Sequence, residues 1–62
     1  MKFLSEEQRT ELIGRHRTER DGRIKDRLKA VLWSDGGWTY RQIAEALFLD
    51  EETASRHVAE YQ

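Results

Sequence analysis

The chain has 62 residues, a formal net charge of −1 and no cysteine. This length allows one domain with a small hydrophobic core, which excludes a large enzyme fold. The lack of cysteine excludes a disulfide framework and a thiolate metal site, and it suits a reducing cytoplasm, where we expect the protein to reside. No segment resembles a signal peptide or approaches the roughly 20 apolar residues that span a bilayer, so we expect a soluble protein without a membrane partner.

The composition and charge pattern predict an all-α domain with a polarised surface. Proline is absent, and aliphatic residues recur at helical spacing among abundant Lys, Arg and Glu. Residues 15–29 hold seven basic and three acidic residues, a balance of +4, whereas residues 50–62 hold four acidic residues and one arginine, a balance of −3. A partner responds to such local patches because charges are screened over about 8 Å in physiological salt. The basic run is either a binding surface or the solvated face of a helix.

A first helix is predicted within residues 1–17. Ser5 and Gln8 form a Ser-x-x-Gln capping box, in which each side chain accepts a hydrogen bond from the other residue's backbone N–H. The apolar stripe of this helix is thin and consists of Leu12 and Ile13. Phe3 and Leu4 are candidates for a hydrophobic staple before the helix. We therefore expect this helix to be the least firmly anchored element.

A second, supporting helix is predicted over residues 18–35. Thr18 is a candidate cap, and Asp21 is a competing start. The run Asp35, Gly36 and Gly37 stops the helix, since glycine readily takes the left-handed conformation that ends one. Trp33 points away from the apolar stripe and is expected to pack under the first helix, the alternative being an exposed spot for a partner. The stripe itself consists of Ile24, Leu28, Val31 and Leu32.

Two shorter helices complete the pattern, over residues 39–48 and 50–61. Thr39 and Gln42 form a second capping box, and Asp50 caps the last helix. The inward-facing residues are Ile43, Ala44 and Leu47 in the first of these helices and Ala54, Val58 and Tyr61 in the second. The outward face of the last helix centres on Glu52, Arg56 and Ala59 and is flanked by Ser55 and Glu60.

A short helix, a tight turn and a polar-faced helix together indicate a helix-turn-helix unit. In such a unit the first helix braces the second, which lies in the major groove of DNA. Ala44 suits this arrangement because the two helices cross closely. The expected fold is thus a four-helix domain with a homeodomain-like three-helix core, in which residues 50–61 form the recognition helix.

The same residues carry a resemblance to a known family. Residues 39–58 read TYRQIAEALFLDEETASRHV and are similar to the bacterial helix-turn-helix consensus. With the upstream run HRTERDGRIKDRLKAVLWSDGGW, they resemble the N-terminal DNA-binding region of insertion-sequence transposases of the mariner superfamily, over most of the chain. This resemblance implies recognition of terminal inverted repeats. The family's ribonuclease-H-like domain, with its three acidic residues, has no counterpart in these 62 residues.

Two positions depart from the general motif. Phe48 occupies the place in the turn where glycine is usual and where a left-handed backbone costs a bulky residue about 1 kcal/mol. Either the turn differs or the packing of Phe48 compensates for this cost. Ala54 stands where a larger aliphatic residue is usual, and Phe48 is a candidate to fill the space.

Three side chains of the last helix are candidates for contacts with DNA bases. Arg56 can donate two hydrogen bonds to guanine, and Ser55 beside it can contact a base or a phosphate. Glu52 can accept from the amino group of cytosine, although Glu51 and Glu52 also suit the positive end of the helix dipole. The alternative for Arg56 is a surface ion pair with Glu52 or Glu60, one turn away.

A second set of residues is predicted to contact the DNA backbone. These residues lie at the start of the bracing helix, in the first turn of the recognition helix, and along the basic run, whose orientation stays open. They are Thr39, Tyr40, Arg41, Thr53, Arg20, Arg23 and Arg27.

Catalysis and cofactor binding are not expected. His16 and His57 lie on different predicted helices without ligand-spaced partners, and no phosphate-binding loop or nucleophile motif is present. The expected partner is duplex DNA, with a homodimer as an additional option and no small-molecule substrate. Two alternatives stay open, namely a helical protein-interaction (dimerisation) module and a free-standing transcriptional regulator.

Overall fold

The computed structural model describes residues 3–61, which form four helices joined by short connections. They are α1 (Glu6–Thr18), α2 (Gly22–Asp35), α3 (Tyr40–Leu47) and α4 (Glu51–Tyr61). No strand occurs within these described residues, and the predicted all-α, four-helix fold is confirmed. Residues 1 and 2 of the predicted first segment, and residue 62 after the predicted last helix, lie outside the described residues.

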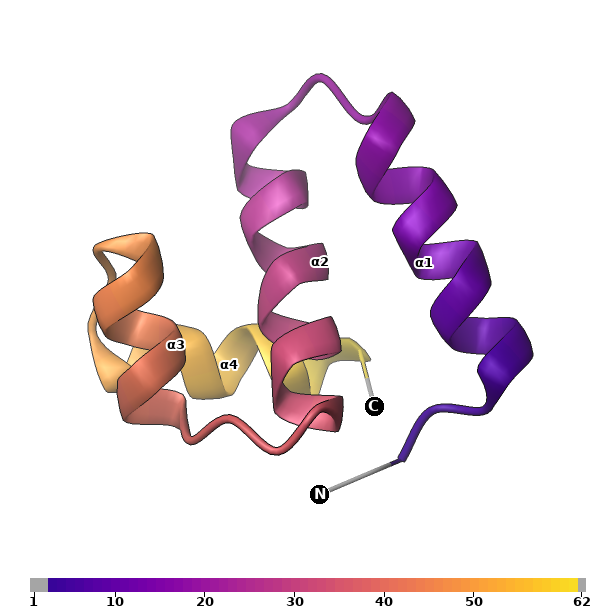
Figure 1. The fold of residues 1–62 in the computed structure, drawn as a ribbon. Coiled ribbons are helices and arrows are strands. Elements are labelled where there is room, and N and C mark those ends of the chain that lie inside the picture. The colour runs from indigo at the N-terminus through magenta and orange to yellow at the C-terminus, as the bar shows by residue number, and fades with distance from the viewer. Residues whose placement is uncertain (1–2, 62) are drawn as a thin grey trace.

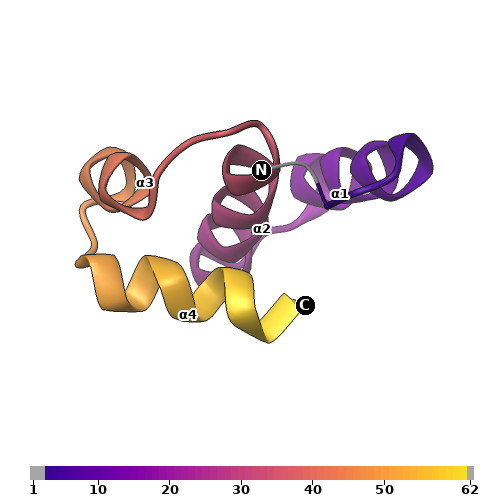
Figure 2. The same ribbon diagram turned by 90° about the horizontal axis from the view of Figure 1, so that it is seen from below.

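The helices are arranged as a row of three crossed by the fourth. Figure 1 shows α2 in the middle of the row, with α1 on one side and α3 on the other. Figure 2, seen from below, shows α4 lying across one face of α3 and α2. Among the described helices, α1 lies close to α2 alone, whereas α2, α3 and α4 each contact one another. The helix-turn-helix pair α3–α4 is therefore built on α2, and α1 is an addition on the far side.

Local capping explains where α1 and α3 begin. In both helices the hydroxyl of the cap accepts a hydrogen bond from a glutamine N–H three residues on, and the glutamine side chain accepts from the N–H of the cap. The distances for Ser5 and Gln8 are 3.1 and 2.9 Å, and those for Thr39 and Gln42 are the same. Each box satisfies two N–H groups that a helix start otherwise leaves free.

The start of α2 differs from the expected Thr18. Thr18 is the last residue of α1, and its hydroxyl donates back to the carbonyl groups of Gly14 and Arg15 at 3.4 and 3.3 Å. The cap of α2 is Asp21, whose carboxylate accepts from the N–H of Arg23 at 2.9 Å. Helix α2 therefore begins at Gly22, because a carboxylate directly before a helix is a better-placed acceptor than a hydroxyl three residues earlier.

The main core lies where α2, α3 and α4 meet. Its buried members are Ala30, Ile43, Ala44, Ala54 and Val58. Trp33 and Leu47 pack against this cluster. Packing under the first helix was expected for Trp33, but the structure places it against this cluster, where its ring stacks on Trp38 with centroids 4.6 Å apart. The loop between α2 and α3 supplies this second tryptophan, which the helical pattern of α2 alone does not reveal.

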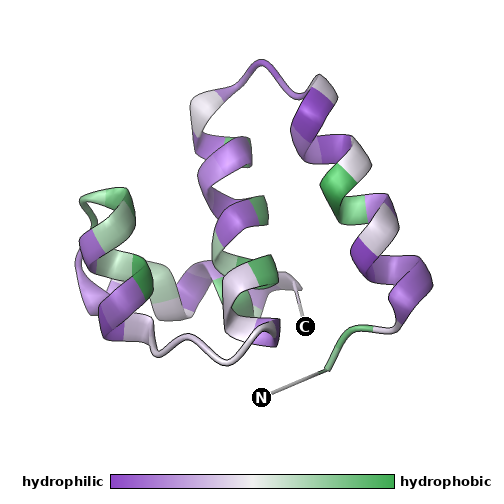
Figure 3. Ribbon diagram, viewed as in Figure 1, coloured by the Kyte–Doolittle hydropathy of each residue, from purple (hydrophilic) through white to green (hydrophobic). Residues whose placement is uncertain are grey.

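A second, smaller cluster joins α1 to α2. Leu12 of α1 is buried with Leu28 and Val31 of α2, and half-buried Phe3 and Leu4 cover its edge. Ile13, the other member of the expected stripe, is 37% exposed. Figure 3 shows α1 as a mainly hydrophilic ribbon with one short hydrophobic stretch near its middle. Apolar packing of α1 thus depends largely on one leucine.

Candidate nucleic-acid interface

The turn between α3 and α4 contains a residue in the left-handed conformation. Phe48 has φ 58° and ψ 41°, and the N–H of the next residue, Leu49, donates to the carbonyl of Ala44 at 2.8 Å. Phe48 itself therefore takes the backbone conformation that usually calls for glycine. Its side chain is 96% exposed. The idea that this ring fills the space beside Ala54 is therefore wrong, and no packing compensates for its backbone strain.

The first turn of α4 is fixed by Asp50. Its carboxylate accepts a hydrogen bond from the N–H of Thr53 at 2.7 Å. Hydrogen bonds from the side chain and then the backbone of Thr53 hold the pKa of Asp50 below its ordinary value of 3.8. Thr53, whose hydroxyl is a predicted phosphate contact, thus serves the helix cap through its backbone N–H. This capping sets the direction in which α4 leaves the turn.

Helix α4 has an apolar inner face and a charged outer face. Ala54 and Val58 are buried against α2 and α3, whereas Glu52 and Arg56 are exposed and Ser55 is half-buried. The guanidinium Nη2 of Arg56 lies 3.3 Å from Oε1 of Glu52. The ion pair that was the alternative role of Arg56 is therefore present, and both side chains project to the same side of the helix.

Tyr61 was expected on the inner face of α4 but is 38% exposed. It lies in the last turn, beyond the buried pair Ala54 and Val58, where it lines a cleft of about 260 Å³. The floor of this cleft includes Ile24, Leu28 and Val31 of α2. The helical spacing places Tyr61 on the side of α4 that faces Leu28 and Val31, but the cleft between them leaves Tyr61 partly exposed.

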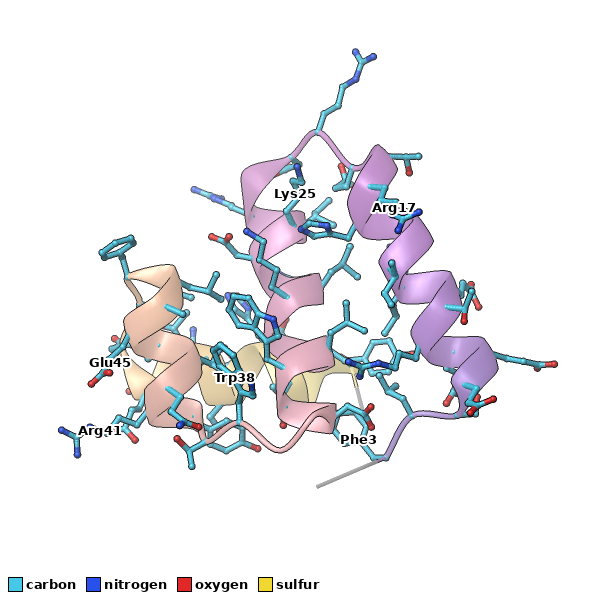
Figure 4. All side chains as sticks on the ribbon, viewed as in Figure 1. Phe3, Arg17, Lys25, Trp38, Arg41 and Glu45 are labelled. Atoms are coloured by element: carbon cyan, nitrogen blue, oxygen red, sulfur yellow. The ribbon has the colours of Figure 1, made fainter. Side chains whose placement is uncertain are left out.

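The start of α3 brings together the three residues expected to meet the DNA backbone there. Thr39 is the cap, Tyr40 is 42% exposed, and Arg41 projects outward with its Nε 3.5 Å from Oε1 of Glu45. Figure 4 shows Arg41 and Glu45 together on the outer edge of α3. Trp38, directly before the cap, is also 42% exposed and is not among the interface residues predicted from the sequence. An aromatic residue adjoining a capping residue is the signal that would have identified it.

The basic run is divided between two places. Arg27 reaches α4, where its Nη2 lies 3.5 Å from Oε2 of Glu60. Arg20 and Arg23 are exposed at the other end of α2 from Thr39. Because α2 has 14 residues, a length of about 21 Å separates its two ends. The structure therefore pairs Arg27 with α4 and leaves Arg20 and Arg23 as a separate group, without an ion pair in the described residues and far from the start of α3.

The two histidines do not approach each other or a common ligand. His57 is half-buried, and its Nδ1 has no hydrogen-bond partner within residues 3–61; the same is true of Nε2 of His16. In the described part of the chain, no group of three or more His, Asp or Glu side chains is arranged to hold a metal ion. None of α1–α4 is long and apolar enough to cross a membrane.

The comparisons with known proteins agree with this geometry. The family model of a homeodomain-like domain matches residues 21–62, which include α2, α3 and α4 and leave out α1. Neither the curated proteins nor the solved structures gave a match. Because the matched region covers more than half of the chain, and because its three helices carry a helix-turn-helix pair, the chain belongs to the homeodomain-like domain family.

Proposed function

We propose that the protein binds duplex DNA in a sequence-specific manner, with α4 lying in the major groove. The observation that carries this proposal is the division of α4 into two faces. Ala54 and Val58 anchor it on α2 and α3, while Glu52, Ser55 and Arg56 lie away from this core. The major groove is about 12 Å wide and admits one helix. In a helix-turn-helix unit the second helix enters the groove, and α4 is the second helix of this pair, with its polar face directed away from the bracing helix α3.

The base-reading roles follow from hydrogen-bond chemistry. Arg56 donates two hydrogen bonds to O6 and N7 of guanine, and Glu52 accepts from the N4 amino group of cytosine. Ser55 contributes a hydroxyl that can donate or accept. Each well-formed two-bond contact discriminates against the wrong base by about 1 to 3 kcal/mol.

The backbone contacts orient α4 in the groove without reading sequence. Thr39, Tyr40 and Arg41 surround the start of α3, where the bracing helix meets the DNA strand. Thr53 lies in the first turn of α4, and Arg27 of α2 is paired with Glu60 in the last turn of α4. Arg20 and Arg23, at the far end of α2, contact phosphates further along the duplex. None of these roles involves a chemical reaction, so the proposed activity is binding without catalysis.

We further propose that the sites recognised are transposon ends. This finer assignment is supported by the resemblance of the sequence to the N-terminal region of mariner-superfamily transposases, in which cleavage is carried out by a separate domain. A free-standing transcriptional regulator would use the same surface. The motif selected by the protein distinguishes the two, because a transposon-end motif occurs in inverted orientation at both ends of a mobile element, whereas a regulator's motif lies near promoters.

The direct test is fluorescence anisotropy of the purified protein with a pool of labelled random-sequence duplexes at several salt concentrations. Duplexes retained by the protein are then amplified and sequenced. Salt-dependent binding with an enriched motif is the expected result, because phosphate contacts give the salt dependence and base contacts give the motif. Absence of binding even at low salt would refute the proposal and favour a helical interaction module, for which sedimentation would then reveal a dimer.

A further inference from the structure

Ion pairs are concentrated at the candidate interface. Of the four ion pairs formed among residues 3–61, one is the structural contact between Arg9 and Asp35. The other three each join an interface arginine to a glutamate. These pairs are Arg56 with Glu52 at 3.3 Å, Arg41 with Glu45 at 3.5 Å and Arg27 with Glu60 at 3.5 Å.

These three pairs face solvent. Their side chains are between 47% and 83% exposed, so a ligand arriving from solution can reach both members of each pair. Exposed ion pairs of this kind add at most about 1 kcal/mol to folding stability and break readily. In contrast, Arg20 and Arg23 form no ion pair within the described residues. The carboxylate of Glu19, next to Arg20, accepts instead from the backbone N–H of Arg20 at 3.0 Å, so ion pairing with glutamate is found at the arginines of α3 and α4 and at Arg27 of α2.

We propose that Glu45, Glu52 and Glu60 are specificity-determining residues, each of which restrains one interface arginine from binding phosphate on non-cognate DNA. The proposal rests on the duplex binding proposed above. A phosphate that captures one of these arginines must displace its carboxylate, which is then left beside a polyanion. The exchange of one anionic partner for another gives little net gain.

A cognate site changes this balance at the pair formed by Glu52 and Arg56. Guanine offers two neutral acceptors to the arginine, so no second negative charge approaches the glutamate. A neighbouring cytosine offers its amino group to Glu52, which then has a hydrogen-bond donor in place of Arg56. The pair therefore favours a site with guanine and cytosine at adjacent read positions and disfavours contact with phosphate alone.

The charge distribution points in the same direction. Non-specific binding arises almost entirely from cations that neutralise phosphates and release counterions. The local charge balance of residues 50–62, which include α4, is −3, so the charge around α4 does not attract DNA. We therefore expect weak binding of random-sequence DNA and a shallow dependence of that binding on salt.

The test compares Glu52→Gln with Glu51→Gln on random-sequence duplexes by fluorescence anisotropy. Glu51 is a matched control, because it is the neighbouring exposed glutamate in the first turn of α4 and forms no ion pair within the described residues. We expect Glu52→Gln to tighten binding about threefold and Glu51→Gln to have a clearly smaller effect. Equal effects of the two substitutions would overturn the proposal, since they would reflect only the loss of one negative charge.

A second comparison, made in the Arg56→Ala variant, distinguishes release of the arginine from direct repulsion of phosphate by Glu52. In the presence of Arg56→Ala, Glu52→Gln should no longer tighten binding, because no arginine is left to release. If the gain persists in that background, Glu52 acts by repelling phosphate directly, and the proposal is wrong. Circular dichroism of each variant checks that the fold is retained.

The combined variant with glutamine at positions 45, 52 and 60 extends the test. It should bind random duplexes at least about tenfold more tightly than the parent protein. The slope of the logarithm of the binding constant against the logarithm of the salt concentration should steepen by about 0.9 for each freed arginine that reaches a phosphate. An unchanged slope would contradict the proposal. Failure of the parent protein and of every variant to bind any duplex would instead refute the proposed function itself.

Discussion

Arg9 of α1 and Asp35 at the end of α2 form the polar contact that fastens the first helix to the rest of the domain. The guanidinium Nη1 of Arg9 lies 2.8 Å from Oδ2 of Asp35 and donates a second bond to the carbonyl of Leu32 at 3.2 Å. The other carboxylate oxygen, Oδ1, accepts from the N–H groups of Phe3 and Leu4, both at 2.8 Å. Because Asp35 is only 2% exposed, these bonds are shielded from water.

Replacement of Asp35 should destabilise the domain more than replacement of Arg9. Asp35→Ala leaves two backbone N–H groups without their acceptor and Arg9 without its carboxylate, at a cost of about 2 to 4 kcal/mol. Arg9→Ala leaves Asp35 with its two backbone donors and should cost about 1 to 2 kcal/mol. Urea unfolding followed by circular dichroism measures both, with Glu11→Ala on the exposed side of α1 as the control. The reverse order would contradict the central role of Asp35.

The same carboxylate makes the fold sensitive to acid. The N–H of Leu4 is the strongest of the contacts that hold the pKa of Asp35 below its ordinary value of 3.8, ahead of the N–H of Phe3 and the guanidinium of Arg9, and burial opposes them. A depressed pKa contributes stability that is present above the unfolded-state value and is lost as the pH falls through the folded-state value. The melting temperature should therefore fall below about pH 4.

Substitution by asparagine tests this origin of the acid sensitivity. Asp35→Asn should lower the melting temperature at pH 7 and flatten its dependence on pH below about pH 4, since the titrating group is gone. Glu11→Gln removes an exposed carboxyl group from α1 and serves as the reference. If the melting temperature of Asp35→Asn depended on pH in the same way as that of the parent protein, other groups would be the cause of the loss of stability in acid.

Phe48 is predicted to be replaceable by glycine with a gain in stability. Its left-handed backbone is unfavourable for a residue with a side chain, and its ring is 96% exposed, so little packing is lost. Phe48→Gly should raise stability by about 0.5 to 1 kcal/mol in thermal or urea unfolding. The matched change Ala46→Gly, at an exposed position inside α3, should lower it by about 1 kcal/mol. Destabilisation by both changes would refute the strain at Phe48.

Ala44 is predicted to set the distance between α3 and α4. It is 4% exposed within the core cluster, so Ala44→Leu should overpack this crossing and cost about 1 to 3 kcal/mol. Ala46→Leu adds the same side chain on the exposed face of the same helix and should have little effect. An unchanged melting temperature for Ala44→Leu would mean that the crossing is not tightly packed.

Much of this fold could be predicted from local sequence signals. The two capping boxes fix the starts of α1 and α3, and the helical spacing of Leu28, Ala54 and Val58 identifies residues that are buried. These features depend on residues within a few positions of one another, so the sequence alone contains them. The sequence predicts too early a start for α2, because the two candidate caps lie three positions apart and only the folded geometry decides between them.

The parts that could not be predicted depend on contacts between distant residues. The contact of Arg9 with Asp35 spans 26 positions, and the stacking of Trp33 on Trp38 requires the loop after α2 to fold back. No periodic pattern records either contact. For the candidate interface, the sequence indicated the residues of α4, but the pairing of Arg27 with Glu60 emerges only when α2 and α4 cross.

The most direct test of DNA recognition by α4 is the affinity of Arg56→Ala for the enriched duplex and for random-sequence duplexes, measured side by side. If Arg56 reads guanine, the variant should lose about 1 to 3 kcal/mol on the enriched duplex, about 5- to 150-fold in affinity, and should bind random duplexes almost as the parent protein does. Equal losses on both would show that Arg56 contacts only phosphate, and no loss on either would remove it from the interface.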